Sequence, residues 1–332
     1  MVGYTESFTD ASYKGQILVM TNPLIGNYGV NPEDFESDGI KVEGLVVYEV
    51  TRPSHYTSKM DLITWFSGEG VPILERVDTR ALVKKIRDEG VKMGIIGQGD
   101  LEDAYKRLKS SPRYEEVDYA RQVSPSQPVV ERPQESRGIR VAVVDCGLKR
   151  GIVRQLLRRG IEVVRVPCWW KADQIAQLEP DGLLLGNGPG NPNLLRGLGE
   201  QAVDLARDGL PVMGICLGHQ LISLGLGART FKMKYGHRGQ NKPSVDLRTG
   251  RCYVTSQNHG YAVEMDSLRE ANLVAWFVNP DDNTLEGAYH PELPIATTQF
   301  HPEADPGPLD TSWIFDLFVE AMGEGLWKFQ RR

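Results

Sequence analysis

Residues 211–227 of the sequence are PVMGICLGHQLISLGLG, and this stretch indicates the fold of the larger part of the chain. Residues 211–215 form an apolar run typical of a buried strand, and the second half of the stretch has the periodicity of a helix. Cys216 lies at the junction, with Gly214 two positions before it and Gly218 two positions after it. A sharp turn from strand to helix needs small residues there, because the backbone passes close to neighbouring elements. The stretch therefore predicts a nucleophile elbow that presents a cysteine.

Strands and helices are expected to alternate along the residues around this turn. This order is typical of an α/β fold with a mostly parallel twisted sheet, right-handed crossovers and helices on both faces. Ligands of such sheets bind at the carboxyl ends of the strands. The expected strands are 139–144, 161–166, 182–185 and 211–215, and the expected helices are 149–159, 172–178, 200–207 and 221–226.

The length of the chain, 332 residues, predicts two domains, because one hydrophobic core usually stops growing below that size. Residues 122–138 contain three prolines, three serines and no sustained apolar period, which is typical of a linker. We therefore expect an N-terminal domain over 1–121 and the α/β domain over 139–332. The N-terminal domain is expected to be smaller and of the α+β type, with strands at 16–21 and 42–50 and helices at 59–68 and 79–89.

Composition and charge exclude several classes of protein. Thirty-eight basic and forty-four acidic residues give a net charge of −6 without a long Lys/Arg cluster, so no nucleic-acid partner is expected. The four cysteines form no Cys-x-x-Cys pair, and the first residues lack the pattern of a secretory signal, so the expected location is the cytoplasm. Residues 209–228 carry no charge, but their period changes from strand to helix, so no membrane span is expected.

The predicted elbow places Cys216 at the N-terminus of a helix, where free N–H groups and the helix dipole favour a thiolate. Most free cysteines are small core residues, and this is the interpretation of Cys146, Cys168 and Cys252, which lie outside the elbow. His219 lies on the elbow helix, where its ring is expected to point back along the helix, so its expected role is structural. Cys216 is the predicted nucleophile.

A thiolate nucleophile needs a histidine base that is held by a carboxylate, and the sequence offers two such pairs. Residues 290–292 and 301–303 are both His-Pro-Glu. The strand expected at 295–300 ends directly before the second segment, at the sheet edge where the elbow opens. His301 is therefore the predicted base, and His290 is expected in a loop or at a sheet edge.

Attack on a carbonyl group also needs N–H donors where the negative oxygen will form. Residues 186–192, GNGPGNP, follow the strand expected at 182–185, and a turn this rich in glycine can bring backbone N–H groups close to a ligand. The predicted donors of this oxyanion hole are the N–H groups of Gly188 and Leu217.

Four motifs together resemble the class I glutamine amidotransferase domain: GICLGHQ at 214–220, GNGPGNP at 186–192, QNHGY at 257–261 and QFHPEA at 299–304. The N-terminal part is similar to the domain found on the small, glutamine-hydrolysing subunit of carbamoyl-phosphate synthetase. That similarity rests on MVGYTESFTDASYKGQILVMTNPLIGNYGVN at 1–31 and DTRALVKKIRDEG at 78–90. The two resemblances cover nearly the whole chain.

The resemblance implies a catalytic triad in which Cys216 is the nucleophile, His301 the base and Glu303 the residue that orients the base. It also implies a set of residues that bind glutamine: Ser12, Gly188, Gly190, Leu217, Gln220, Asn258, Gly260 and Tyr261. The sequence departs from the family pattern at Asn191, where Asp is usual, at Tyr261, where Phe is common, and within DCGLKRG at 145–151. None of these departures is expected to touch the triad.

The resemblance further implies hydrolysis of L-glutamine to glutamate and ammonia through a thioester on Cys216. The ammonia would pass to a separate large subunit, which makes carbamoyl phosphate from bicarbonate and two ATP for arginine and pyrimidine biosynthesis. No Gly-x-x-x-x-Gly-Lys-[Ser/Thr] phosphate loop occurs in the sequence, so no cofactor is expected on this chain, and ATP and magnesium are expected on the large subunit. The sequence shows no metal-ligating cluster, so no metal site is expected.

Three other functions stay open. The chain could be the glutaminase of an amidotransferase with another acceptor, such as chorismate or a purine nucleotide, although such an enzyme would not need residues 1–121. It could be a silent docking subunit, which the intact triad disfavours. It could be a thiol peptidase or γ-glutamyl hydrolase, which the motif at 257–261 disfavours.

Family members normally have further residues before the segment that begins here at Met1, and those residues build the first strands of the N-terminal domain. We therefore expect the natural chain to start upstream of Met1. Without those strands, an unpaired sheet edge and exposed apolar surface would promote aggregation.

Overall fold

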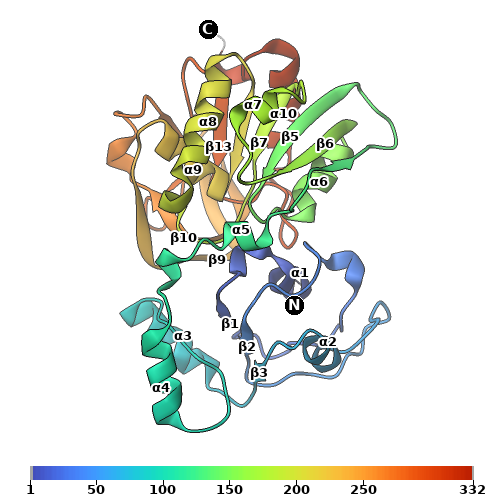
Figure 1. Cartoon of the computed structure of the whole chain (residues 1–332), viewed down its shortest axis with the longest axis vertical. Coiled ribbons are helices and arrows are strands. Elements are labelled where there is room, and N and C mark those ends of the chain that lie inside the picture. Colours follow the sequence, from blue (N-terminus) through green and yellow to red (C-terminus); the bar gives the residue numbers. More distant parts are fainter. Residues whose placement is uncertain (1–2, 331–332) are drawn as a thin grey trace. The chain divides into compact units, whose positions relative to one another are not determined.

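The computed structural model describes residues 3–330, which divide into two compact units (Figure 1). The first unit contains residues 3–119 together with 189–191, and the second contains 120–188 together with 192–330. Each unit has its own hydrophobic core. The short segment 189–191 lies in the glycine-rich turn, so this turn contributes residues to both units.

The first unit is a small α+β structure around a three-stranded parallel sheet of order β1-β2-β3. Phe8, Leu45 and Phe66 are fully buried in its core. The strands and helices expected in this part are present, with shorter strands, and α4 is an additional helix. The elements are α1 (Tyr4–Thr9), η1 (Ala11–Tyr13), β1 (Ile17–Val19), η2 (Pro32–Asp34), β2 (Gly44–Val46), α2 (Leu62–Gly68), β3 (Ile73–Leu74), α3 (Thr79–Glu89), α4 (Leu101–Ser110) and η3 (Tyr114–Glu116).

The second unit contains a ten-stranded sheet of order β10-β9-β11-β12-β13-β8-β7-β5-β6-β4. In this order, neighbouring strands are parallel from β13 through β8, β7 and β5 to β6, and antiparallel elsewhere. The sheet is therefore mixed, and the predicted α/β fold class is confirmed. Its strands are β4 (Val129–Glu131), β5 (Ile139–Asp145), β6 (Ile161–Pro167), β7 (Gly182–Leu185), β8 (Val212–Ile215), β9 (Thr230–Asp246), β10 (Cys252–Val263), β11 (Val274–Val278), β12 (Leu285–Tyr289) and β13 (Ile295–Thr298).

Helices cover both faces of this sheet because its central strands are apolar on both sides. Val141 and Val143 of β5 pack in one core cluster with α6 and α10, whereas Ala142 and Val144 pack in the other with α7, α8 and α9. The helices are α5 (Ala120–Val123), α6 (Arg150–Leu157), α7 (Ala172–Ala176), α8 (Arg196–Arg207), α9 (Leu217–Gly225) and α10 (Trp313–Glu324), with short turns η4 (Pro192–Leu195), η5 (Met265–Ser267) and η6 (Lys328–Gln330).

The structure differs from the prediction that residues 122–138 form a linker. Residues Val129–Glu131 form β4, which pairs antiparallel with β6 at the edge of the large sheet. Pro128 and Pro133 flank this strand, and proline is tolerated beside an edge strand because no ladder hydrogen bond is lost there. The composition that predicted a linker therefore surrounds a short strand of the second unit.

The sequence analysis also expects no strands between residues 230 and 289, where the structure has four. β9 and β10 form a long antiparallel hairpin, and β11 and β12 follow it in the sheet. β9 is largely polar, and irregularities interrupt its register with β10. A strand of this kind lacks the apolar alternation on which a prediction from sequence depends.

Residues 209–228, the uncharged stretch, divide into β8 and α9. Within residues 3–330, no helix has the length and apolar character needed to cross a membrane.

Candidate active site

The predicted elbow is present at the end of β8. Cys216 has φ 55° and ψ −102°, a conformation that side chains rarely adopt, and α9 begins at the next residue. A Cβ on Gly218 would lie 2.0 Å from the carbonyl oxygen of Leu185, and one on Gly214 would lie 2.8 Å from backbone atoms of Gly218. Only glycine fits at both positions, which explains why the sequence has small residues on either side of the cysteine.

The thiol of Cys216 is buried at the N-terminus of α9, where the helix dipole favours a negative charge. Its Sγ atom lies 3.8 Å from the carbonyl oxygen of Asn258 in β10. The N–H of Cys216 donates to the carbonyl of Thr298, the last residue of β13, at 2.8 Å. Cys216, the predicted nucleophile, is therefore held between β10 and β13, which carry or precede other predicted residues of the site.

His301 and Glu303 lie in the same buried cluster as Cys216. His301 Nδ1 lies 2.6 Å from Glu303 Oε1, so Nε2 is the ring nitrogen that remains for the thiol. Burial lowers the pKa of His301, but the Glu303 carboxylate and the Cys216 thiolate raise it more strongly, to about 10. The raised pKa favours the imidazolium form of His301 beside the sulfur of Cys216, an arrangement typical of a cysteine–histidine site.

The topology of the sheet explains why His301 reaches the elbow. β13 and β8 are parallel neighbours, with Thr298 opposite Ile215, so residues that follow β13 lie beside residues that follow β8. The N–H of His301 donates to the carbonyl of Ser256 at 2.9 Å, which fixes the backbone there. His290 precedes β13 and lies at the other end of that strand, in the turn after β12. The choice between the two His-Pro-Glu segments is thus supported by the register of two strands.

Lys149 is a charged residue of this cluster that the sequence analysis missed. Its Nζ lies 3.0 Å from Glu303 Oε1 and also donates to the carbonyl of Ala304, and the side chains of Lys149 and Glu303 are both buried. Burial raises the pKa of Glu303, but Lys149 and His301 together lower it by more than burial raises it, so the carboxylate stays ionised. The available signal was position: Lys149 follows β5, and segments that follow parallel strands meet at one sheet edge.

Gly188 and Leu217, the predicted oxyanion-hole residues, lie against each other in the second unit. A Cβ on Gly188 would lie 2.4 Å from the carbonyl oxygen of Cys146 and 2.9 Å from Leu217 Cδ2, so glycine is required for this close approach. The N–H of Gly218 donates to the carbonyl of Gly186 at 3.1 Å, and this hydrogen bond fixes the glycine-rich segment against the start of α9. The role of these two residues as oxyanion-hole donors stays a prediction.

Four further predicted glutamine-binding residues, Gln220, Asn258, Gly260 and Tyr261, lie in the second unit. Gln220 Nε2 donates to the carbonyl of Tyr261 and to Gln299 Oε1, both at 2.9 Å. Asn258 and Gly260 lie in the same stretch of β10 as Tyr261, at an irregularity of the β9–β10 register. Gln220 therefore links the elbow helix, β10 and the residues next to His301.

The remaining two predicted glutamine-binding residues, Ser12 and Gly190, belong to the first unit. The N–H of Ser12 donates to Asp10 Oδ1, and its carbonyl accepts from Gln16 Nε2. Gln16 Nε2 also donates to the hydroxyl oxygen of Tyr114 at 3.2 Å, and the N–H of Gly190 donates to the same oxygen at 3.0 Å. The two residues thus belong to one hydrogen-bonded network, and their binding of glutamine stays a prediction.

The other cysteines and His219 have the positions expected of them with one exception. Cys146 and Cys168 are buried in the core that includes α8 and α9. Cys252 is exposed at the start of β10, so its interpretation as a core residue is wrong. His219 is fully buried with Nδ1 2.8 Å from Thr297 Oγ1, and burial lowers its pKa to about 3, which fits a structural role.

Two family models match the chain. The model described as Glutamine amidotransferase class-I matches residues 142–321, which hold the elbow and the triad. The model described as Carbamoyl-phosphate synthase small chain, CPSase domain, matches residues 1–96 in the first unit.

Curated relatives match the chain over nearly its whole length, and three of them are named carbamoyl phosphate synthase small chain. The protein from Pyrobaculum aerophilum is 51% identical over 96% of this chain and 90% of its own length. The protein from Sulfurisphaera tokodaii is 49% identical over 96% of this chain and 87% of its own length. The protein from Pyrococcus furiosus is 49% identical over 97% of this chain and 89% of its own length.

Proposed function

The chain belongs to the carbamoyl phosphate synthase small chain family, and on this premise we propose how its residues carry out the reaction. Its activity is the hydrolysis of L-glutamine, which supplies ammonia for carbamoyl phosphate synthesis. We propose Cys216 as the nucleophile, His301 as the acid and base, and Glu303 as the group that orients His301. The observation that carries this assignment is the buried Cys216, His301 and Glu303 cluster at a strained elbow.

The proposed reaction starts from the thiolate–imidazolium pair. The thiolate sulfur of Cys216 attacks the side-chain amide carbon of glutamine, and the carbonyl electrons move to the oxygen. His301 then gives its Nε2 proton to the amide nitrogen, the C–N bond breaks, and ammonia leaves a thioester on the sulfur.

Water completes the cycle. The neutral His301 takes a proton from a water molecule while the oxygen of that water attacks the thioester carbon. The second tetrahedral intermediate collapses to glutamate, and both the Cys216 thiolate and the His301 imidazolium are restored. Glu303 keeps Nδ1 of the ring protonated throughout, which leaves Nε2 as the nitrogen that moves the proton.

The proposed oxyanion hole consists of the N–H groups of Gly188 and Leu217. Donors that are fixed before the reaction stabilise the developing charge without reorganisation, and one such donor contributes about 2.7–4 kcal/mol. The contact of Gly188 with the Leu217 side chain supports this pairing. The remaining proposed contacts to glutamine are made by Ser12, Gly190, Gln220, Asn258, Gly260 and Tyr261.

We further propose that the ammonia passes to a large subunit that binds ATP and magnesium and makes carbamoyl phosphate for arginine and pyrimidine biosynthesis. This chain would then need no cofactor for its own half-reaction. The proposed location is the cytoplasm, where thiols stay reduced, because none of the four cysteines is in a disulfide within residues 3–330.

The experiment replaces the nucleophile in the complex with its large subunit. Cys216→Ser should reduce glutamine-dependent carbamoyl phosphate synthesis by at least about 10⁴-fold, because triad members act as a unit. Ammonia-dependent synthesis by the same complex should survive. If both activities disappear from a folded, assembled complex, the division of labour between the chains is wrong.

The same assay tests the other functions. Ammonia-dependent product other than carbamoyl phosphate would support an amidotransferase with another acceptor. Unchanged glutamine-dependent synthesis in Cys216→Ser would support a silent docking subunit. Hydrolysis of γ-glutamyl peptides in preference to glutamine would support a peptidase or γ-glutamyl hydrolase.

A further inference from the structure

Three buried side chains outside the triad have the donor atoms of a metal site. They are His237 of β9, His259 of β10 and Glu286 of β12. His237 and His259 are direct partners in the antiparallel register of the hairpin, so both side chains lie on one face of it. One donor atom from each of the three residues lies within 4.8 Å of the other two.

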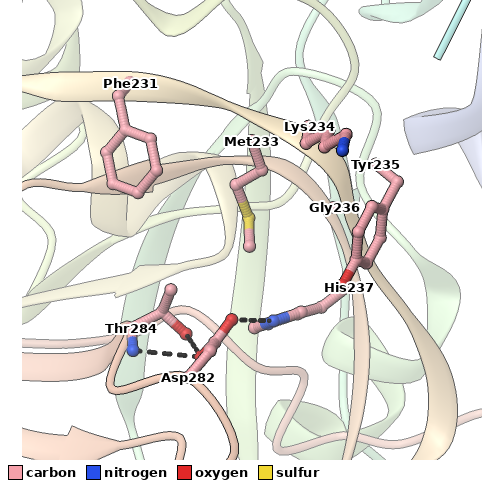
Figure 2. A pocket seen from close by; sticks show the side chains of 8 residues that line it. All are labelled: Phe231, Met233, Lys234, Tyr235, Gly236, His237, Asp282 and Thr284. Carbon is pink, nitrogen blue, oxygen red and sulfur yellow. Dashed lines mark hydrogen bonds and ion pairs between the residues drawn. The ribbon is translucent and has the colours of Figure 1, made fainter. Parts of the chain in front are cut away.

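The outer nitrogen of each ring already has an acceptor. His259 Nδ1 lies 2.9 Å from the carbonyl oxygen of Tyr261, which can only accept, so Nδ1 carries a proton. His237 Nε2 lies 2.8 Å from Asp282 Oδ2, as Figure 2 shows. Asp282 is itself held by the N–H and the hydroxyl of Thr284, at 3.1 and 2.7 Å. Metal-binding histidines have this arrangement, because an acceptor on one nitrogen fixes the tautomer that presents a lone pair on the other.

The inner nitrogens of both rings face the carboxylate of Glu286. His237 Nδ1 lies 3.2 Å and His259 Nε2 lies 3.6 Å from Glu286 Oε1. Among residues 3–330, His259 Nε2 and Glu286 Oε2 have no hydrogen-bond partner, although both atoms are buried. With the outer nitrogens protonated, neutral rings would direct two lone pairs at a carboxylate, which is unfavourable without a positive charge between them.

Either two additional protons or one metal ion can supply that charge. The protons would create two imidazolium rings in edge contact, with centroids 5.0 Å apart, and like charges repel strongly in a buried site. Glu286 Oε2 would still have no partner in the described part of the chain. A single divalent cation accepts both lone pairs and neutralises the carboxylate, so it satisfies the cluster with fewer buried charges.

We propose that this cluster binds a divalent transition-metal ion of the zinc class, with His237 Nδ1, His259 Nε2 and the Glu286 carboxylate as ligands. Two imidazoles and one carboxylate are a common zinc ligand set. Ligands about 2.0–2.1 Å from a tetrahedral ion lie about 3.3–3.4 Å from one another. The observed separations of 3.2 and 3.6 Å are close to that value. The Glu286 Oε2 atom or a water molecule would complete the coordination.

The position of the cluster indicates a structural role for the ion. It would connect the β9–β10 hairpin to β12, and Gly260 and Tyr261 follow directly after one of its ligands. The carbonyl of Glu286 accepts the N–H of Gln299 at 2.8 Å, two residues before His301. An ion here would hold the strand that carries part of the proposed glutamine site in register with the strand that leads to the base.

Solvent can reach the cluster through a pocket of about 290 Å³ (Figure 2). The pocket is lined by Phe231 and residues 233–237 of β9 together with Asp282 and Thr284, so its lining includes the ligand His237 and its carboxylate partner. It is formed where β9 has four residues, 233–236, opposite the single residue Gly260. A metal ion could enter by this route after folding.

The test uses the full chain, produced without a polyhistidine tag and freed of metal with a chelator. Zn²⁺ should bind with a stoichiometry of one per chain, measured by elemental analysis after gel filtration. Co²⁺ should give the visible absorption of a tetrahedral site. Glu286→Gln and His237→Asn should both lose this absorption, and Asp282→Asn should weaken Zn²⁺ binding by about 10–100-fold, as loss of a carboxylate partner does at other sites.

Two control variants test whether the metal ion binds to this cluster or to other side chains of the protein. His55→Asn, which changes an exposed histidine of the first unit, should bind both ions as the unchanged chain does. Cys216→Ser should also retain the ion, and the Co²⁺ complex should show no sulfur charge-transfer band. Loss of the ion in Cys216→Ser would place it in the triad and overturn the proposal.

A second measurement does not depend on whether the cluster variants fold. Pulsed electron paramagnetic resonance of Cu²⁺-loaded Cys216→Ser protein counts the imidazoles bound to the metal. Two coordinated imidazoles support the proposal. Fewer than two, or failure of the unchanged chain to bind one Zn²⁺, would show that protons occupy the cluster instead.

Discussion

The segments at 290–292 and 301–303 have the same three residues, His-Pro-Glu, and lie at opposite ends of β13. The second segment follows β13 and meets the elbow at the end of the parallel neighbour β8. The first precedes β13 and fills the turn from β12. The comparison teaches that an identical tripeptide meets different surroundings according to the end of the strand at which it stands, and only the second segment lies beside the elbow.

The two histidines also differ in their proton chemistry. His290 Nδ1 accepts hydrogen bonds from the N–H groups of Glu292 and Leu293, and the carboxylate of Glu292 is exposed. His301 Nδ1 instead faces the buried carboxylate of Glu303, which Lys149 also contacts. Accepting backbone N–H bonds requires an unprotonated nitrogen, whereas a buried carboxylate favours a protonated one.

The largest expected effect is that of His301→Asn, which removes the proposed base. Glutamine hydrolysis should fall by about 10²–10⁴-fold, because a general base contributes that range. Burst kinetics of ammonia release would measure the rate of thioester formation directly.

His290→Asn is the matched control, because it makes the same change in the same tripeptide. Turnover should change by less than about tenfold, since loop substitutions away from the site have small effects. If His290→Asn were the variant that abolishes thioester formation, the assignment of the catalytic segment would be reversed.

Lys149→Met tests the difference between the two glutamates of these segments, because Glu303 has a buried lysine partner whereas Glu292 is exposed. The free energy of unfolding should fall by about 3 kcal/mol, since removal of one partner of a buried ion pair leaves the other poorly compensated. Urea denaturation of the full chain would measure it. Lys106→Met breaks an exposed pair with Glu102 and should change stability by less than about 1 kcal/mol, so an equal loss in both variants would contradict the prediction.

Glu303→Gln should reduce kcat of glutamine hydrolysis by about 10²-fold, less than loss of the base, because the third member of a triad contributes less than the other two. The amide keeps the shape but cannot stabilise the imidazolium form of His301. Glu292→Gln changes an exposed carboxylate and should leave kcat unchanged. Equal losses in the two variants would argue against a triad.

The protonation of the two histidines should shift in opposite directions. The pKa of His301 is raised to about 10 although burial opposes this, and burial lowers the pKa of His290. The stabilising contribution of His301 is present below its unfolded pKa of about 6.5 and is lost as pH rises through the folded value. The contribution of neutral His290 is present above about pH 6.5 and is lost as pH falls through its lower folded pKa.

Nuclear magnetic resonance of ring nitrogens in the full chain would measure both protonation states. At about pH 8 His301 should still be protonated and His290 neutral. A neutral His301 under these conditions would argue against the thiolate–imidazolium pair.

The smallest effect is expected for the stability of the first segment. His290→Ala removes an acceptor of two backbone N–H groups and should cost about 1–2 kcal/mol. The oxygen of His290→Asn can replace Nδ1 as the acceptor, so that variant should lose less. Thermal denaturation of the pair would test this, and equal losses would show that ring packing, not hydrogen bonding, is what His290 contributes.

Features that depend on neighbours in sequence could be predicted. The elbow was predictable because Gly214 and Gly218 stand at fixed positions around Cys216, and the close contacts at both glycines explain that pattern. The strand that leads to His301 was predictable because residues 295–300, IATTQF, are rich in strand-forming residues and end just before it. These signals are local, since they arise from the geometry of one turn and one strand.

Features that depend on contacts between distant segments were decided only by the tertiary structure. Lys149 contacts Glu303, 154 residues away, and its position after β5 indicates the sheet edge at which it lies but not its partner there. The proposed metal ligands His237, His259 and Glu286 lie on three strands, none of which was predicted from the sequence, and the register of β9 with β10 is irregular. Local periodicity determines which segments form strands and turns, whereas the register of the sheet determines which side chains meet, because pairing depends on the whole sheet at once.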